Sequence, residues 1–144
     1  MHSVPAGYVS GAGPAWHAAG MTRLHHVNLG VPPDGADDEA RFLVEVLGYR
    51  KVEPSAKAQG FGARWYETDD GTQVHLSLDP DHQPAARAHT AIEFGDGLED
   101  VAVRLRDAGI EFGDGEFDGN RILFCQDPAG NRWELRGVGE ASTA

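Results

Sequence analysis

The feature that most constrains the fold is an internal repeat that begins near residue 23. The first unit reads as a strand, a helix and three further strands, at 23–31, 39–48, 49–53, 63–68 and 72–78. The second unit repeats this order, at 87–94, 98–109, 110–114, 121–126 and 131–137. Two βαβββ units of about sixty residues are therefore predicted, a period typical of a repeated supersecondary unit. One such unit has too little core to be stable alone, so the units must pair, within the chain or between chains.

Both helical patterns are amphipathic and end at a glycine, which is a usual helix terminator. One face of the first helix carries four apolar residues before Gly48, namely Ala40, Leu43, Val44 and Leu47. The second has the same arrangement before Gly109, with Leu98, Val101, Ala102 and Leu105. The acidic run DGADDE at 34–39 fits the N-terminus of the first helix, where the helix dipole favours negative charge.

Aligning the two units places metal-ligating side chains at equivalent positions. His26 and His89 lie on the first strands, and His75 and Glu134 on the last strands, each four residues after a turn glycine. If the paired sheets wrap around one cavity, all four side chains can point into it. Trp133 is out of phase with Glu134 and should then pack against a helix. The alternative is that ordinary solvent-facing residues coincide at these positions.

Strand alternation helps to choose between neighbouring residues. Only one of His25 and His26 can face the cavity, and His26 is preferred because Val27, Leu29 and Val31 then share the helix-packing face. In the stretch GTQVHLSL, His75 alternates with aliphatic residues, which also fits a position on the solvent side of a strand.

The composition excludes several classes of partner. A net charge of −11 disfavours nucleic acid and anionic membrane surfaces, and no apolar run reaches the length of a membrane span. The single cysteine, Cys125, rules out an intrachain disulfide framework and fits a reducing cytoplasm; it lies in the run ILFC and is predicted to be a buried, inert thiol.

The organisation expected along the chain has four parts. Residues 1–20 are expected to be a flexible leader, with Met21 a plausible native start. The first module covers 21–82, the second covers 83–138, and a short tail follows at 139–144.

Three stretches resemble one family. LHHVNLGV opens the first unit, AHTAIEF opens the second, and DPAGNRWEL lies near the end. Together they resemble the vicinal oxygen chelate superfamily, which includes glyoxalase I, bleomycin-resistance proteins and extradiol dioxygenases, over residues 22–137. The resemblance implies an α+β fold in which two βαβββ modules pair into a U-shaped mixed sheet around a metal cavity. It also implies a homodimer, in some members with modules exchanged between chains.

In that family the metal ligands come from the first and last strands of each module, which correspond here to His26, His75, His89 and Glu134. Three imidazoles and one carboxylate suit one divalent transition metal: Fe, Mn, Ni, Co or Zn. Two adjacent open positions would suit a small molecule that presents neighbouring oxygens. The ion would act as a Lewis acid toward an enolate-like or metal-bound intermediate, with Glu134 as the residue that takes a proton.

Further polar residues share the expected cavity face. Asn28, Glu93 and Arg132 are the candidates for binding substrate, and the alternative for each is a solvent-facing position at the rim. Trp65, Tyr66 and Phe124 are expected in the core or the pocket wall.

The resemblance favours a metal-dependent enzyme, either a lyase or isomerase or a dioxygenase. Glyoxalase I-like members usually carry a glutamate where this chain has His75. Extradiol dioxygenases and fosfomycin-type thiol transferases use a set similar to His26, His89 and Glu134. The alternative is a metal-free protein that sequesters a drug or metabolite, as bleomycin-resistance relatives do. A third possibility is a hydrogen-bonded His/Glu cluster in a structural scaffold.

Overall fold

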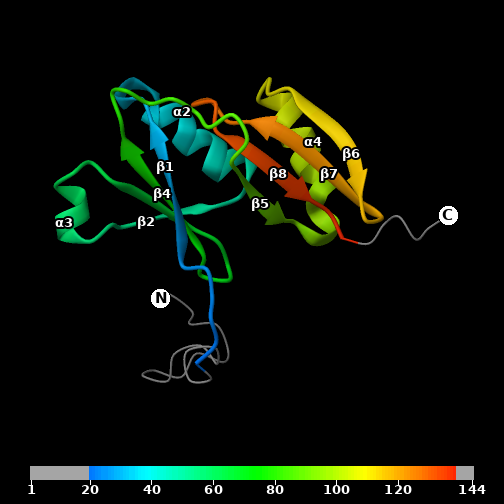
Figure 1. Cartoon of the computed structure of the whole chain (residues 1–144), viewed down its shortest axis with the longest axis horizontal. Coiled ribbons are helices and arrows are strands. Elements are labelled where there is room, and N and C mark those ends of the chain that lie inside the picture. The colour runs from blue at the N-terminus through cyan, green and yellow to red at the C-terminus, as the bar shows by residue number, and fades with distance from the viewer. Residues whose placement is uncertain (1–19, 139–144) are drawn as a thin grey trace, which may run out of the picture.

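The computed structural model of the chain describes residues 20–138, which form two modules with the same order of elements (Figure 1). The first module contains β1 (His26–Val31), η1 (Pro33–Gly35), α2 (Ala36–Arg41), η2 (Phe42–Val46), β2 (Arg50–Val52), α3 (Ala56–Gln59), β3 (Arg64–Glu67) and β4 (Gln73–Leu78). The second contains β5 (His89–Glu93), η3 (Gly95–Gly97), α4 (Leu98–Asp107), β6 (Phe112–Phe117), β7 (Asn120–Gln126) and β8 (Arg132–Arg136). All but Gly20 of the predicted leader, and the predicted tail, lie outside the described residues.

Each module forms its own four-stranded mixed sheet. The strand orders are β1-β4-β3-β2 and β5-β8-β7-β6, and they match element by element. In each sheet the first strand is parallel to the last, and the remaining pairs are antiparallel. This arrangement confirms the predicted α+β class and the repeat of two βαβββ modules. No helix among residues 20–138 is long and apolar enough to cross a membrane.

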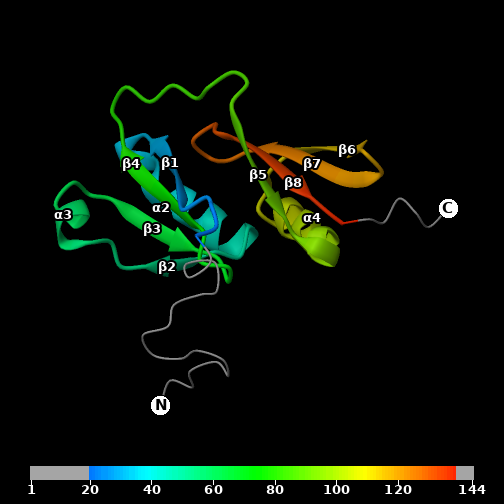
Figure 2. The same cartoon turned by 60° about the horizontal axis from the view of Figure 1, so that its bottom comes forward.

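The two modules share one hydrophobic core where their helices meet (Figure 2). Phe42 of η2 packs on Trp133 of β8, with ring centroids 5.7 Å apart, which confirms that Trp133 packs against a helix. Arg104 of α4 donates from Nε to the Val46 carbonyl at 2.9 Å. One face of each sheet packs against the helices and forms this core. The candidate ligands alternate with the core residues along the strands, so they lie on the opposite faces, which the helices leave uncovered.

The first helix differs from its prediction in length and in its buried face. It begins at Ala36, and its second half, η2, is π-helical. Val44 is 41% exposed, whereas Glu39, Phe42 and Val46 are buried. Of the predicted face residues, Leu43 and Leu47 are buried and Ala40 packs against the core, so only Val44 was wrong. In α4 the predicted residues Leu98, Val101, Ala102 and Leu105 are all buried.

The one-turn helix α3 was not predicted. It spans only Ala56–Gln59, and its first turn is capped by Ser55 Oγ, which accepts from the Ala58 amide at 3.3 Å. A single turn contains no full repeat of a 3.6-residue period, so periodicity cannot detect it.

Asp127 organises the DPAGN turn between β7 and β8. Its Oδ1 accepts from the amides of Ala129 (3.0 Å) and Asn131 (2.8 Å), and its Oδ2 accepts from Trp133 Nε1 (2.9 Å). Asp127 is only 5% exposed, so its carboxylate exchanges water for three protein donors. These three hydrogen bonds fix the backbone conformation of the turn, which contacts the first module.

This turn fastens the second module to the first. Ala129 donates its amide to Glu39 Oε2 at 3.2 Å, and Asn131 Nδ2 donates to the Gly30 carbonyl at 3.1 Å. His82, on the connection between the modules, bonds through Nε2 to the Ala129 carbonyl at 3.0 Å. The sequence motif that carries the family resemblance thus serves as the joint between the modules.

A buried carboxyl pair lies inside this joint. Glu39 is fully buried beside Asp127, and burial first, then Asp127, raises the pKa of Glu39 to about 10. Among the described residues, Oε1 of Glu39 is a buried oxygen without a hydrogen-bond partner. Glu39 is therefore protonated at neutral pH, which removes the repulsion between two buried carboxylates.

Candidate functional site

In the first module, His26 and His75 meet on the uncovered face of the sheet. Val27, Leu29 and Val31 pack into or against the core, so alternation along β1 turns His26 to the other side. β1 and β4 are parallel neighbours, and His26 pairs with Gln73 in their register. The rings of His26 and His75 stack, with centroids 3.9 Å apart and planes inclined by 14°.

His75 is enclosed between two rings. Trp65, its register partner on β3, stacks on it at 4.2 Å with an interplanar angle of 5°. His75 is 8% exposed. Burial, followed by the nearby His26 and His25, lowers the pKa of His75 to about 4. The imidazole is therefore neutral at pH 7 and keeps one nitrogen lone pair available.

The stacked geometry limits what His26 and His75 can do together. Imidazole lone pairs lie in the ring plane, so two nearly parallel stacked rings cannot both direct a lone pair at one ion. His26 also bonds through Nδ1 to Nδ1 of His25 at 2.9 Å. Joint binding of one ion requires one ring to turn, and the exposed His26 has the space to do so.

In the second module, His89 and Glu134 lie on the corresponding face. His89 opens β5, and its Nδ1 bonds to the Arg87 carbonyl at 3.0 Å. Because a carbonyl only accepts, Nδ1 carries the hydrogen and Nε2 keeps the lone pair. Glu134 on β8 accepts from Arg136 Nη1 through Oε2 at 2.9 Å. This contact places a guanidinium next to the carboxylate.

A single chain does not assemble the four predicted ligands into one site. Residues 20–138 contain no group of three or more His, Cys, Asp or Glu side chains that could hold a metal ion. The structure brings His26 and His75 together on one sheet and places His89 and Glu134 on the other sheet.

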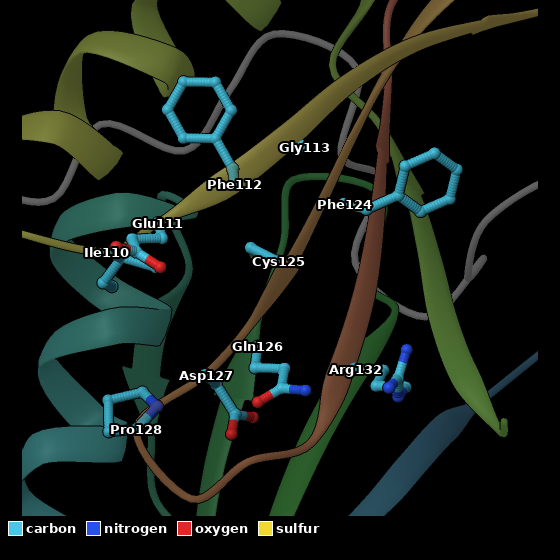
Figure 3. A pocket seen from close by; sticks show the side chains of 10 residues that line it. All are labelled: Ile110, Glu111, Phe112, Gly113, Phe124, Cys125, Gln126, Asp127, Pro128 and Arg132. Atoms are coloured by element: carbon cyan, nitrogen blue, oxygen red, sulfur yellow. The ribbon is translucent and has the colours of Figure 1, made fainter. Parts of the chain in front are cut away.

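The three predicted substrate-binding residues occupy different places. Asn28 accepts through Oδ1 from Ser77 Oγ at 2.9 Å on the first module's uncovered face. Arg132 lines an open cavity of about 750 Å³ on the second module, together with Phe124 and Gln126 (Figure 3). Glu93 lines a separate hollow of about 590 Å³ that β4 and β5 border.

The contact between Trp65 and His75 was not predicted. A two-residue turn at Asp70-Gly71, as the sequence suggests, would pair Tyr66 with His75. The loop instead has three residues, because the Thr68 amide donates to the Thr72 carbonyl at 3.0 Å, and the register therefore pairs Trp65 with His75.

Comparisons with known proteins agree with this architecture. The family model described as Glyoxalase/Bleomycin resistance protein/Dioxygenase superfamily matches residues 23–135. No curated protein matches the chain significantly.

Several solved structures share the fold. A putative glyoxalase family protein from Bacillus anthracis is similar with a TM-score of 0.73 and 22% identity, covering 81% of this chain and 95% of that one. A glyoxalase/dioxygenase from Nostoc punctiforme has a TM-score of 0.70 and 22% identity, with coverage of 82% and 92%.

The fosfomycin resistance protein FosX from Listeria monocytogenes has a TM-score of 0.66 and 15% identity, with coverage of 86% and 99%. At these identities the likeness establishes the fold. Taken with the match of the family model over most of the sequence, it shows that the chain belongs to the Glyoxalase/Bleomycin resistance protein/Dioxygenase superfamily.

Proposed function

We propose that the protein is a metal-dependent enzyme acting on a small molecule that chelates one divalent transition metal through adjacent oxygens. The observation that carries this proposal is the pair of repeat-related ligand sets, His26 with His75 and His89 with Glu134, on the uncovered faces of the two sheets. A FosX variant that shares the fold, with a TM-score of 0.66, was solved with Mn(II) and 1S,2S-dihydroxypropylphosphonic acid.

The protonation states of the candidate ligands fit such an ion. His75 is neutral at pH 7, since its pKa is lowered to about 4. His89 keeps its Nε2 lone pair because Nδ1 is committed to a carbonyl. Glu134 adds one negative charge. A set of imidazoles and one carboxylate suits Fe, Mn, Ni, Co or Zn.

Two ligands from one module are too few for a stable site, since transition metals in proteins usually take three or more protein ligands. We infer a homodimer in which the first module of one chain faces the second module of its partner. His26 and His75 from one chain would then join His89 and Glu134 from the other, at two equivalent sites.

Residues around the ligands would serve binding and proton transfer. A divalent ion would supply Lewis acidity and open coordination positions to the substrate. Glu134, the only carboxylate of the set, is the group that accepts a proton. Arg132 would contact an anionic part of the substrate, and Asn28 and Glu93 would contact its polar groups. This chemistry suits a lyase, an isomerase or a dioxygenase.

The cytoplasm is the compartment that fits the single thiol. Burial first, then Asp127, raises the pKa of Cys125 to about 12, so this cysteine remains a neutral thiol. A small-molecule substrate and a second copy of the chain are the partners that this function requires.

Metal content measured by elemental analysis tests the proposal, on protein made without a polyhistidine tag. We expect about one transition metal ion per chain, and a loss of metal in both His75→Ala and Glu134→Gln. Glu116→Gln, which changes an exposed carboxylate on β6, is the matched control and should keep its metal. Wild-type protein without any metal would contradict the proposal.

A metal-free binding protein is the second candidate, and the stack of Trp65, His75 and His26 favours it. Three nearly parallel rings form a platform for a planar ligand, and the stacked imidazoles do not converge on one ion. Binding of a planar aromatic compound that is unaffected by EDTA and is lost in Trp65→Ala would favour this function over the enzyme.

A further inference from the structure

A row of hydrogen-bonded side chains crosses the first sheet next to His75. Arg50 of β2 pairs with Glu67 of β3, and Glu67 pairs with Gln73 of β4, in the registers of the antiparallel strands. Side chains of directly paired residues point to the same face of a sheet. The row therefore leads along the face that carries His75, which lies two residues beyond Gln73.

The donor and acceptor of each hydrogen bond in the row can be assigned by starting from Arg50. Arg50 can only donate, and it donates to Asp69 Oδ1 at 2.8 Å and to Glu67 Oε2 at 3.2 Å. The ionised Glu67 can only accept, so the hydrogen bond between its Oε1 and Gln73, 3.2 Å long, comes from the amide nitrogen Nε2.

The orientation of Gln73 then decides which nitrogen of His75 carries a hydrogen. With Nε2 of Gln73 turned to Glu67, its carbonyl Oε1 faces His75 Nε2 at 2.8 Å. A carbonyl oxygen only accepts, so His75 Nε2 must donate. The lone pair of the neutral ring is consequently on Nδ1.

We propose that Gln73, oriented by Glu67 and Arg50, is a positioning residue that holds His75 in the Nε2–H tautomer, so that Nδ1 is the nitrogen offered to an ion or a substrate. Trp65 and His26 fix the plane of the same ring by stacking on its two faces. The role of Nδ1 as a ligand rests on the proposed function, whereas the tautomer itself does not.

The strands β5–β8 of the second module contain no equivalent row, so the proposed positioning role applies to His75 alone. Arg132 occupies the position of Gln73 in the aligned strands, and it pairs with Gln126 where Gln73 pairs with Glu67. Arg132 has no acceptor atom to offer. Glu134, the counterpart of His75, is held by Arg136 on its other side.

Nitrogen-15 NMR of the histidine rings at pH 7 tests the tautomer directly, on the full chain before any metal is added. The His75 signals are assigned by their loss in His75→Ala. We expect a protonated Nε2 and an unprotonated Nδ1. A His75 ring that is protonated at Nδ1 would overturn the proposal.

Two variants test whether Gln73 and Glu67 cause this tautomer. Glu67→Gln preserves shape but can donate as well as accept, so Gln73 loses its fixed orientation and His75 should become a mixture of tautomers. Gln73→Leu should have the same effect. Glu53→Gln, an exposed carboxylate after β2, is the control and should leave His75 unchanged. If Gln73→Leu does not fold, the isosteric Glu67→Gln still decides, and a pure Nε2–H tautomer in that variant would contradict the proposed cause.

Metal titration separates this inference from the proposed function. We expect Gln73→Leu to weaken metal binding by about 10- to 100-fold, the usual cost of losing a group that orients a metal ligand. Metal binding of wild-type strength in Gln73→Leu would overturn the positioning role while leaving the proposed function intact. A correct tautomer in a chain that binds no metal would refute the proposed function and leave the tautomer assignment standing.

Discussion

The two modules share the same order of elements but surround two equivalent positions, those of His75 and Glu134, with different side chains. His75 is neutral, almost fully buried and held by an amide, with a ring on each face. Its counterpart Glu134 is a carboxylate held by the Arg136 guanidinium at 2.9 Å. The difference shows that the fold fixes where these side chains stand, whereas their strand neighbours fix their charge and their exposure.

The aromatic residues next to the two positions show the same contrast. Trp65 is paired with His75 and covers its ring, whereas Phe124 is paired with Glu134 and is 49% exposed at the wall of a cavity (Figure 3). The ring of His75 is thus covered by an aromatic side chain, whereas Phe124 borders an open cavity with Arg132 in its lining.

The largest effect is expected at the turns, where the modules differ most in burial. Asp127→Ala removes an acceptor shared by three donors in the joint, although the Ala129 amide keeps Glu39 Oε2 as a second acceptor, so we expect a loss of about 3 kcal/mol in the free energy of unfolding. Asp70→Ala makes the matched change in the exposed turn of the first module and should cost about 1 kcal/mol. Urea denaturation measures both, and equal losses would contradict the assignment of the joint to the second turn.

The pH dependence of stability should come from the same joint. The pKa of Glu39 is raised from 4.5 to about 10 by burial and by Asp127, so the folded chain holds a proton that the unfolded chain lacks between these values. Stability is then greatest below the lower value and falls as pH rises, by at most about 1.4 kcal/mol per pH unit.

Glu39→Gln tests this dependence, because an amide donates and accepts without titrating. Asp127 and Tyr66 are the other ionisable groups that interact with Glu39, and His82 bonds to the same turn. We expect the variant to be more stable than wild type at pH 9 and to lose less stability between pH 6 and pH 9. Glu45→Gln, an exposed change in η2, is the control and should retain the wild-type slope. A slope that is identical in Glu39→Gln would show that Glu39 is ionised in the fold.

A smaller difference in unfolding free energy is expected between substitutions at the two aromatic positions, Trp65 and Phe124. Trp65→Ala uncovers His75 and should lower the free energy of unfolding by about 2 kcal/mol, since a large ring loses both burial and stacking. Phe124→Ala removes a half-exposed ring and should cost less than about 1 kcal/mol. Thermal unfolding of both variants measures the difference, which would vanish if the two surfaces were equivalent.

The smallest effect on stability is expected for Arg136→Gln. Its ion pair with Glu134 is partly exposed, with side-chain exposures of 24% and 17%, so its loss should change the free energy of unfolding by less than about 1 kcal/mol. Chemical denaturation provides the measurement. A loss as large as that of Asp127→Ala would mean that this pair, too, is part of the folding core.

Much of the fold could be predicted because its signals are local. Strand alternation and the hairpin turns located the eight strands, and the apolar period of α4 gave its buried residues correctly. In the first helix, Leu43 and Leu47 are buried as predicted, but the burial of Glu39 was missed because it depends on Asp127, far away in the sequence. Such a pair leaves no trace in a local pattern.

In the candidate site, too, some features have a local sequence signal and others depend on residues far apart in the sequence. Alternation turns His26 away from the core, where it meets His75. Trp65 lies beside His75 because the hairpin loop has three residues, one more than an Asp70-Gly71 turn predicts. The separation of His26 and His75 from His89 and Glu134 depends on how the modules pack against each other. That packing depends on contacts of the DPAGN turn with the first module and on the shared core. Both join residues that are far apart in the sequence, so no local pattern predicts them.

The most direct test of a site shared between two chains is the metal content of a mixed dimer. One chain carries His26→Ala and the other Glu134→Ala, and each carries a different purification tag without histidines. We predict that each variant alone binds no metal, whereas the mixed dimer regains about one ion, because the unaltered modules of the two chains form one complete site. A mixed dimer without metal, from a protein whose wild type binds it, would show instead that each site is built within a single chain.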